Sequence, residues 1–338
     1  MKTEQSNHNI QQSDSCNVID SIEFKDKEEK CRYVDCIHIE SIEQLVIILS
    51  DLKRKNSFFR GQKDWKWRVN SGVQREWFKN RLLRDKSYNG SLSVNQFFQE
   101  FLDYIKGKTP LAARGVLEEF SLISELQHYG APTPFIDFTT HPWIALFFAL
   151  GMDSSDFSEI AEDTMCSLYS FQPGSGAATP ENDWTNYSVI IRQALAPAIS
   201  PPMFDCTTPV NTYKFLEHFS CIYLRDDETE LLKLYNPRLT AQKGMFVHLG
   251  KKYQHRNLDE VTCLGSDGAS GGQFKDALSF SKLDCLEISP ELFPRITQEI
   301  QKRKITRKSL FLDDSKLAGS FFGKLLFECF MQHLTDNS

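Results

Sequence analysis

The sequence predicts an α+β fold in which small mixed or antiparallel sheets carry flanking helices. Two patterns that recur along the chain support this prediction. Short apolar runs bounded by glycine, proline or polar clusters are typical of strands. Longer segments with an apolar residue every three or four positions are typical of helices that bury one face. The predicted strands lie at 36–39, 57–61, 135–138, 166–171, 244–249 and 283–288.

The helical segments are marked by their ends as well as by their periodicity. Ser41 followed by Gln44 has the pattern of a capping box, and Pro142 suits the first position of a helix. Gly130 ends another helix, because Pro132 and Pro134 prevent its continuation. The predicted helices cover 41–53, 94–107, 111–129, a segment that starts at 142, 290–302 and 316–334.

Composition divides the 338 residues into three parts. Residues 1–32 are polar and poor in aromatic side chains, so we expect a disordered tail. Residues 33–290 contain all the predicted strands and are expected to form the domain. Residues 291–338 contain helical patterns, and we expect a helical C-terminal extension that packs on the domain.

Charge and cysteine usage restrict the class of protein. The net charge is −6 and the pI is about 5.8, which disfavours nucleic acid as a partner without excluding it. Nine cysteines stand at irregular spacings with no C-x-x-C pair, as expected for reduced thiols in the cytoplasm. The longest apolar stretch, Trp143 to Leu150, is shorter than the roughly 18 residues of a membrane span. We therefore predict a cytoplasmic protein with no membrane partner.

Several chemistries lack a signal in the sequence. His248 and His255 have no cysteine or carboxylate at metal-ligand spacing, so no metal is expected. The chain contains no phosphate-binding Walker loop, no G-x-G-x-x-G dinucleotide fingerprint and no G-x-S-x-G nucleophile elbow. A Cys–His nucleophilic pair would form in space rather than in sequence, and so it stays open.

Three segments together resemble the FRG domain family. The first is Phe59-Arg60-Gly61-Gln62, followed by tryptophans and a terminal Arg75. The second is the segment QHYGAPTPFIDFT from Gln127 to Thr139, and the third is the segment NPRLTAQKGMF from Asn236 to Phe246. The resemblance covers about residues 40–250. Two positions depart from the family pattern, because Pro134 stands where the family has arginine and Phe138 where it has tryptophan. The family occurs in bacteria and phages, often in apparent defence or toxin contexts.

The order of the motifs is also similar to that of ADP-ribosyltransferases, which split NAD in a cleft between two small sheets. In those enzymes a first strand presents an arginine or histidine beside a glycine. A second strand ends in serine or threonine before an alanine-rich helix, and a third element presents a glutamate or glutamine. Here Arg60-Gly61, Thr139 and Gln242 fall in that order. The resemblance implies that such a cleft exists here and that NAD is a candidate substrate.

The resemblance also implies roles for single residues. Arg60 and Gln242 would be catalytic, with Arg60 gripping phosphate through its fork of donors. Gly61 would allow a ligand close to the backbone. Gln242 would lie near the reacting bond, where it acts by dipole and hydrogen bond rather than by charge. The residues expected to bind the ligand are Arg60, Gly61, Gln62, His128, Asp137, Thr139 and Arg238.

Most of these residues also have a purely structural interpretation. Arg60 pairs with Asp137 inside the core in that interpretation, and Asp137 is then a structural carboxylate. His128 caps a helix or packs in the core. Thr140 is then the N-cap of the helix that starts at Pro142. Gln242 holds the turn before the last motif strand, and Arg238 is a surface residue.

The sequence therefore favours an FRG-domain protein with a nucleotide cleft, NAD being one candidate, and with ADP-ribosyltransferase-like or NAD-cleaving activity. Its partners would be a small nucleotide and an unidentified protein target, in a bacterial or phage defence or toxin setting. The alternative is a sensing or interaction module without catalysis that recognises a nucleotide or a phage component. A third reading is a toxin that acts on nucleic acid. Sequence alone leaves the enzymatic question open.

Overall fold

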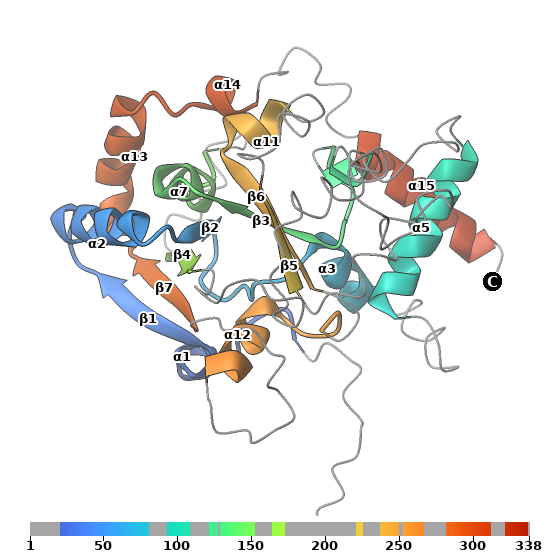
Figure 1. Ribbon diagram of the computed structural model, residues 1–338, viewed down its shortest axis with the longest axis horizontal. Coiled ribbons are helices and arrows are strands. Elements are labelled where there is room, and N and C mark those ends of the chain that lie inside the picture. The colour runs from blue at the N-terminus through green and yellow to red at the C-terminus, as the bar shows by residue number, and fades with distance from the viewer. Residues whose placement is uncertain are drawn as a thin grey trace, which may run out of the picture.

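The computed structural model describes residues 21–80, 93–108, 122–124, 126–127, 129–152, 164–172, 221–225, 237–249, 253–266, 282–311 and 322–336. Within these residues, strands form one mixed sheet in the order β1-β7-β4-β2-β3-β6-β5 (Figure 1). The strands are β1 (Val34–Ile39), β2 (Phe58–Gln62), β3 (Phe135–Thr139), β4 (Cys166–Phe171), β5 (Cys221–Arg225), β6 (Gly244–Leu249) and β7 (Leu283–Ile288).

Most of the described helices begin where the sequence supplies a cap or a proline. Ser41 caps α2 by accepting from the Gln44 amide, Ser71 forms a full capping box with Gln74 at the start of α3, and Pro142 opens α7. The helices are α1 (Lys27–Tyr33), α2 (Ile42–Arg54), α3 (Gly72–Lys79), α5 (Val94–Lys108), α7 (Pro142–Ala149), α11 (Pro237–Ala241), α12 (Leu258–Ser266), the short 3-10 turn η2 (Pro290–Leu292), α13 (Phe293–Lys302), α14 (Arg307–Leu310) and α15 (Phe322–Asp336).

The sheet consists of two parts that are joined weakly. Strands β1 and β7 are parallel, and every other neighbouring pair is antiparallel. Strand β2 pairs with β4 at five positions, and β3 pairs with β6 at five positions. Strands β2 and β3 pair only at Phe59 and Thr139. We call β1-β7-β4-β2 the first half-sheet and β3-β6-β5 the second half-sheet.

Different helices cover the two half-sheets. Helices α2, α7 and α13 pack on the first half-sheet, where Phe59 of β2 joins their apolar cluster. Helices α3, α5 and α15 pack on the second half-sheet, where Phe135 of β3 and Phe246 of β6 join theirs. Figure 1 shows these two groups of helices well separated from each other. The line between them runs over the junction of β2 and β3.

A third apolar cluster lies on the other face of the sheet and belongs to both halves. It combines Phe58 of β2 with Ile136 and Phe138 of β3, and helix α12 contributes Leu258 and Val261. Phe138, the position that departs from the family's tryptophan, packs edge-to-face on Phe171 with ring centroids 4.9 Å apart. This shared cluster holds the half-sheets together where their backbone pairing is sparse.

The expected disordered tail over 1–32 is too long. Residues 27–33 form helix α1, with Asp26 as N-cap accepting from the Glu29 amide at 2.8 Å. Lys30 is fully buried, and its ammonium donates to Ser167 at 2.8 Å and lies 3.3 Å from Glu287. The polar composition gave no sign of this helix, because its buried residue is a lysine whose partners lie far along the chain. The boundaries at 290 and 291 stay predictions.

A buried ion pair fixes the segment after β2. The Nε and Nη2 atoms of Arg68 donate to one carboxylate oxygen of Asp259 at 3.0 and 2.7 Å, and the other oxygen accepts from the Val69 amide at 2.9 Å. The Arg68 guanidinium also lies 4.3 Å from the ring centroid of Tyr33. These contacts join α12, α1 and the segment that follows the β2 motif.

Asp259→Ala should lower the free energy of unfolding by about 3 kcal/mol, because the buried Arg68 loses the carboxylate that its Nε and Nη2 bind and keeps only the contact of Nη2 with Glu260 at 2.9 Å. Urea unfolding followed by circular dichroism measures the change. Asp51→Ala is the control, since Asp51 makes ion pairs with Arg54 and Lys55 in solvent and its loss should leave the midpoint nearly unchanged. Equal effects for the two variants would contradict a structural role for the Arg68 pair.

His248 should make the fold less stable in acid. It is fully buried on β6, and burial lowers its pKa to about 4. The unfolded side chain has a pKa of about 6.5, so between about pH 6.5 and pH 4 the unfolded state binds a proton that the native state does not. The free energy of unfolding therefore falls as the pH drops through this range. We expect His248 to reduce the free energy of unfolding by about 2 kcal/mol between pH 7 and pH 5. His248→Gln should reduce this pH dependence in urea titrations, and an unchanged dependence would contradict the assignment.

Candidate functional site

A cavity of about 710 Å³ lies at the junction of the two half-sheets. Its walls come from β2, β3, α7, α11 and the segment that follows β2. Of the eight residues that the sequence assigned to the site, His128 lies outside the described residues. The other seven line this one cavity, although they come from three separate motifs: Arg60, Gly61, Gln62, Asp137, Thr139, Arg238 and Gln242.

Arg60 crosses the gap where β2 and β3 diverge. Its Nη1 donates to the main-chain oxygen of Asp137 at 2.8 Å, and its Nε is buried with no partner among the described residues. The structural interpretation paired Arg60 with Asp137, and the two residues are in contact, but the acceptor is the main-chain oxygen of Asp137 rather than its carboxylate. Burial lowers the pKa of Arg60, and the charge of Asp137 opposes that shift. An arginine keeps its proton in proteins, so this guanidinium is a cation in the gap.

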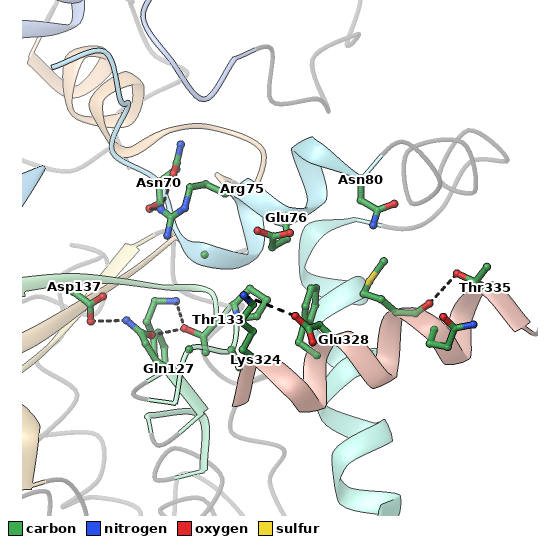
Figure 2. Close-up of a pocket in the computed structure, with 18 of the residues that line it drawn as sticks. Asn70, Arg75, Glu76, Asn80, Gln127, Thr133, Asp137, Lys324, Glu328 and Thr335 are labelled. Carbon is green, nitrogen blue, oxygen red and sulfur yellow. Dashed lines mark hydrogen bonds and ion pairs between the residues drawn. The ribbon is translucent and has the colours of Figure 1, made fainter. Parts of the chain in front are cut away.

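Asp137 is exposed although it lies in the middle of a strand. The strand β3 is buried at its other four positions. Its carboxylate accepts from the Gln127 amide, and the oxygen of that amide accepts from the Thr133 hydroxyl, as Figure 2 shows. The interpretation of Asp137 as a sealed core carboxylate therefore fails. It is an oriented carboxylate on the cavity wall.

Gly61 and Gln62 both make close contacts within the protein, and their expected roles in binding a ligand stay predictions. A Cβ on Gly61 would stand 1.9 Å from the Ala145 carbonyl oxygen and 2.7 Å from the Ala149 amide, so the close approach here is that of helix α7. Gln62 is 5% exposed and donates to the Arg68 carbonyl at 3.3 Å. Its side-chain oxygen has no partner among the described residues.

Thr139 and Gln242 lie beside each other and are both held by main-chain groups. The Thr139 hydroxyl donates to the Gln242 carbonyl at 2.8 Å and accepts from the His141 amide at 3.1 Å. The Gln242 side chain donates to the Leu310 carbonyl at 3.4 Å. Thr139 therefore positions the third motif. The interpretation of Thr140 as the cap of α7 is wrong, because His141 is the N-cap residue.

Arg238 is not a free surface side chain. It lies on α11, and its guanidinium stacks 4.3 Å from the ring centroid of Phe311, a residue that follows α14 and also lines the cavity. Phe311 in turn packs against Phe148 of α7 with centroids 6.1 Å apart. One side of the cavity is thus an aromatic and cationic wall.

The cavity is cationic in an acidic chain. Only two carboxylates, Glu23 and Asp137, are found among the described residues of its lining. Arg68 is neutralised by Asp259 outside the cavity, but Arg60 and Arg75 have no ion pair with any described carboxylate. Among the described residues, six basic side chains line the cavity: Arg60, Lys63, Arg68, Arg75, Lys79 and Arg238. Such a lining attracts an anionic ligand.

A second cavity of about 660 Å³ adjoins the first (Figure 2). It extends from Arg75 of α3 to helix α15, and five residues line both cavities. Arg75 is the terminal residue of the first motif, but the sequence did not assign it to the site, because nothing in the sequence shows that α3 brings it near Arg60. The shared residues are Arg60, Asn70, Arg75, Gln127 and Asp137.

Other kinds of site are not found in the part of the chain that the structure describes. No group of three or more histidine, cysteine, aspartate or glutamate side chains there has an arrangement that could hold a metal ion. No described helix is long and apolar enough to cross a membrane.

Comparison with known families gives a match to the FRG domain. The family model of the FRG domain matches residues 55–157, which include β2, β3 and α7 and therefore both sides of the junction. The match ends before α11 and β6, which carry the third motif. Comparisons with curated proteins and with solved structures gave no match.

Gly61→Ala should lower the free energy of unfolding by about 1–3 kcal/mol, because the new methyl group collides with the backbone of α7. Thermal unfolding measures this change. Gly107→Ala is the matched control, since a Cβ there meets nothing within 4 Å and the residue lies in helix α5. It should stabilise by about 0.5–1 kcal/mol. A neutral Gly61→Ala would mean that α7 does not pack on β2 as described.

Proposed function

We propose that this protein, whose residues 55–157 match the family model of the FRG domain, binds an anionic nucleotide in the cavity between the half-sheets. The observation that carries the proposal is the cationic lining of that cavity in a chain whose net charge is −6. Among the described residues, five basic side chains besides the paired Arg68 line it, against two acidic ones. An anion is the ligand that such a lining favours, and phosphate is the anion that a guanidinium fork fits best.

Arg60 is the proposed phosphate ligand. It uses one donor on the Asp137 carbonyl, and no described carboxylate pairs with its charge. The backbone that carries the guanidinium is also held in place, because Arg60 pairs with Tyr169 of β4 and the next residue, Gly61, lies against α7. A preordered cation loses little conformational entropy when a phosphate binds.

The remaining walls suit a nucleoside. Phe148 and Phe311 give the cavity an apolar side, and Trp67, 41% exposed, lines it near the N-terminal segment. Exposed aromatic faces are surfaces on which bases stack. The volume of about 710 Å³ falls within the range of small-molecule sites.

The proposed activity is transfer or hydrolysis of the ADP-ribosyl group of NAD. In that reaction the bond between the ribose carbon and the nicotinamide nitrogen breaks, and its electron pair leaves with nicotinamide. Water or an acceptor side chain supplies the new bond to the ribose carbon and gives up a proton. Gln242 supports this proposal because it lines the same cavity as Arg60, and its main chain is fixed by Thr139. Its amide would orient the ribose.

A binding module without catalysis is the second candidate, and one observation favours it. At the third motif the chain presents an amide, which cannot stabilise by charge the cation that develops on the ribose. Among the described lining residues, the Asp137 carboxylate already accepts a hydrogen bond from the Gln127 amide, which orients it toward Gln127. A nucleotide sensor needs the cationic cavity but not a catalytic carboxylate.

Titration calorimetry with ADP-ribose tests the proposal. Wild type should bind, and Arg60→Ala should lose at least about tenfold in affinity, since charge-assisted hydrogen bonds contribute roughly 1.5–3 kcal/mol. Arg54→Ala is the control, because Arg54 is exposed on α2 and pairs with Asp51. Equal affinities for wild type and Arg60→Ala would refute the proposed phosphate ligand.

Nicotinamide release from NAD separates the two candidates. Turnover that falls in Gln242→Ala while ADP-ribose affinity stays within about threefold would support the enzyme. Binding by wild type without any turnover, lost in Arg60→Ala, would support the sensor.

A further inference from the structure

The two cavities meet at a pair of arginines. Arg60 and Arg75 line both, with Asn70 and Gln127 beside them. Neither cavity is closed off from these side chains, so a ligand group that contacts the two guanidinium groups has space on either side of it. Figure 2 shows Arg75 and Asn70 on one side of the second cavity and Asp137 and Gln127 facing them.

Arg75 is held by neutral groups only. Its Nη1 donates to the Asn70 carbonyl at 2.9 Å and to the Asn70 side-chain oxygen at 3.0 Å. No described carboxylate forms an ion pair with it. Burial and the nearby charge of Arg60 together hold the pKa of Arg75 at about 10, below its ordinary range. Two arginines that repel each other in a partly buried site are stabilised by an anion bound between them.

The second cavity differs in character from the first. Its charges balance, because Arg60, Arg75 and Lys324 face Glu76, Asp137 and Glu328. Phe135, Phe327 and Met331 give it an apolar floor. A balanced polar rim above an apolar floor suits an uncharged group such as a base or nucleoside rather than a second phosphate.

We infer that the ligand has two arms joined by a pyrophosphate: the pyrophosphate lies on Arg60 and Arg75, one nucleoside lies in the first cavity and the other in the second. The ligand class is therefore a dinucleotide rather than a mononucleotide. This inference rests on the proposed nucleotide site and extends it by naming Arg75 and the second cavity. A pyrophosphate carries two charges, one for each guanidinium. The volumes of about 710 and 660 Å³ each lie in the range that holds one compact group.

The test fills the second cavity without touching the arginines. Gln332 lies on the exposed side of α15 and lines the second cavity but not the first. Gln332→Trp adds bulk there without changing the charge. Leu325→Trp is the matched control, because Leu325 is 56% exposed on the same helix and lines neither cavity. Titration calorimetry with NAD, AMP and nicotinamide mononucleotide then compares the two-armed probe with its two halves.

We expect wild type to bind NAD at least tenfold more tightly than either half. Gln332→Trp should weaken NAD at least tenfold and weaken only one of the halves, whereas Leu325→Trp should change none of the three. Arg75→Ala should weaken NAD more than either half. Two results would overturn the inference and leave the first cavity as a mononucleotide site. In one, wild type binds AMP or nicotinamide mononucleotide as tightly as it binds NAD. In the other, Gln332→Trp binds NAD within twofold of the wild-type affinity. Wild type that binds none of the three removes the proposed function together with the inference.

Discussion

One backbone pair, Phe59 with Thr139, joins the two halves of the sheet, and the site depends on it. Beyond this pair β2 stays with β4, and β3 stays with β6, so a gap opens between them. The gap persists because α7 holds β2 through its contact with Gly61, while the Thr139 hydroxyl holds β3 to the turn before β6. Arg60 is the side chain that crosses the gap. A fully paired sheet would have no room for a ligand here.

Most of the fold could be predicted because its signals are local. Apolar alternation and caps located β2, β3, β4, β6, β7, α2 and α5 to within a few residues. Helix α1 was missed because its buried anchor is Lys30, a residue type that indicates exposure. Helix α3 was missed because only Val73, Gln74 and Trp77 of its eight residues are buried. The Arg68–Asp259 pair spans 191 positions, and no local pattern reports a contact of that kind.

The grouping of the candidate residues and the contacts of each residue depend on different features of the structure. Seven described residues from three motifs line one cavity because β2 and β3, which carry two of the motifs, are neighbours that pair at a single position. Their roles in binding stay predictions. The contacts could not be read from residue types. Gly61 accommodates a helix, Thr139 binds the main chain of Gln242, and Asp137 is exposed in a strand. Each of these outcomes depends on which segment packs across from the residue, which tertiary structure decides.

The proposed phosphate site is the gap at Arg60. A crystal of the protein soaked with ADP-ribose would show where the phosphates bind. We expect density for the phosphates within hydrogen-bond distance of the Arg60 guanidinium, with the Asp137 carbonyl contact kept. Density for the ligand at another place on the molecule, with the gap filled by protein side chains or water alone, would contradict it.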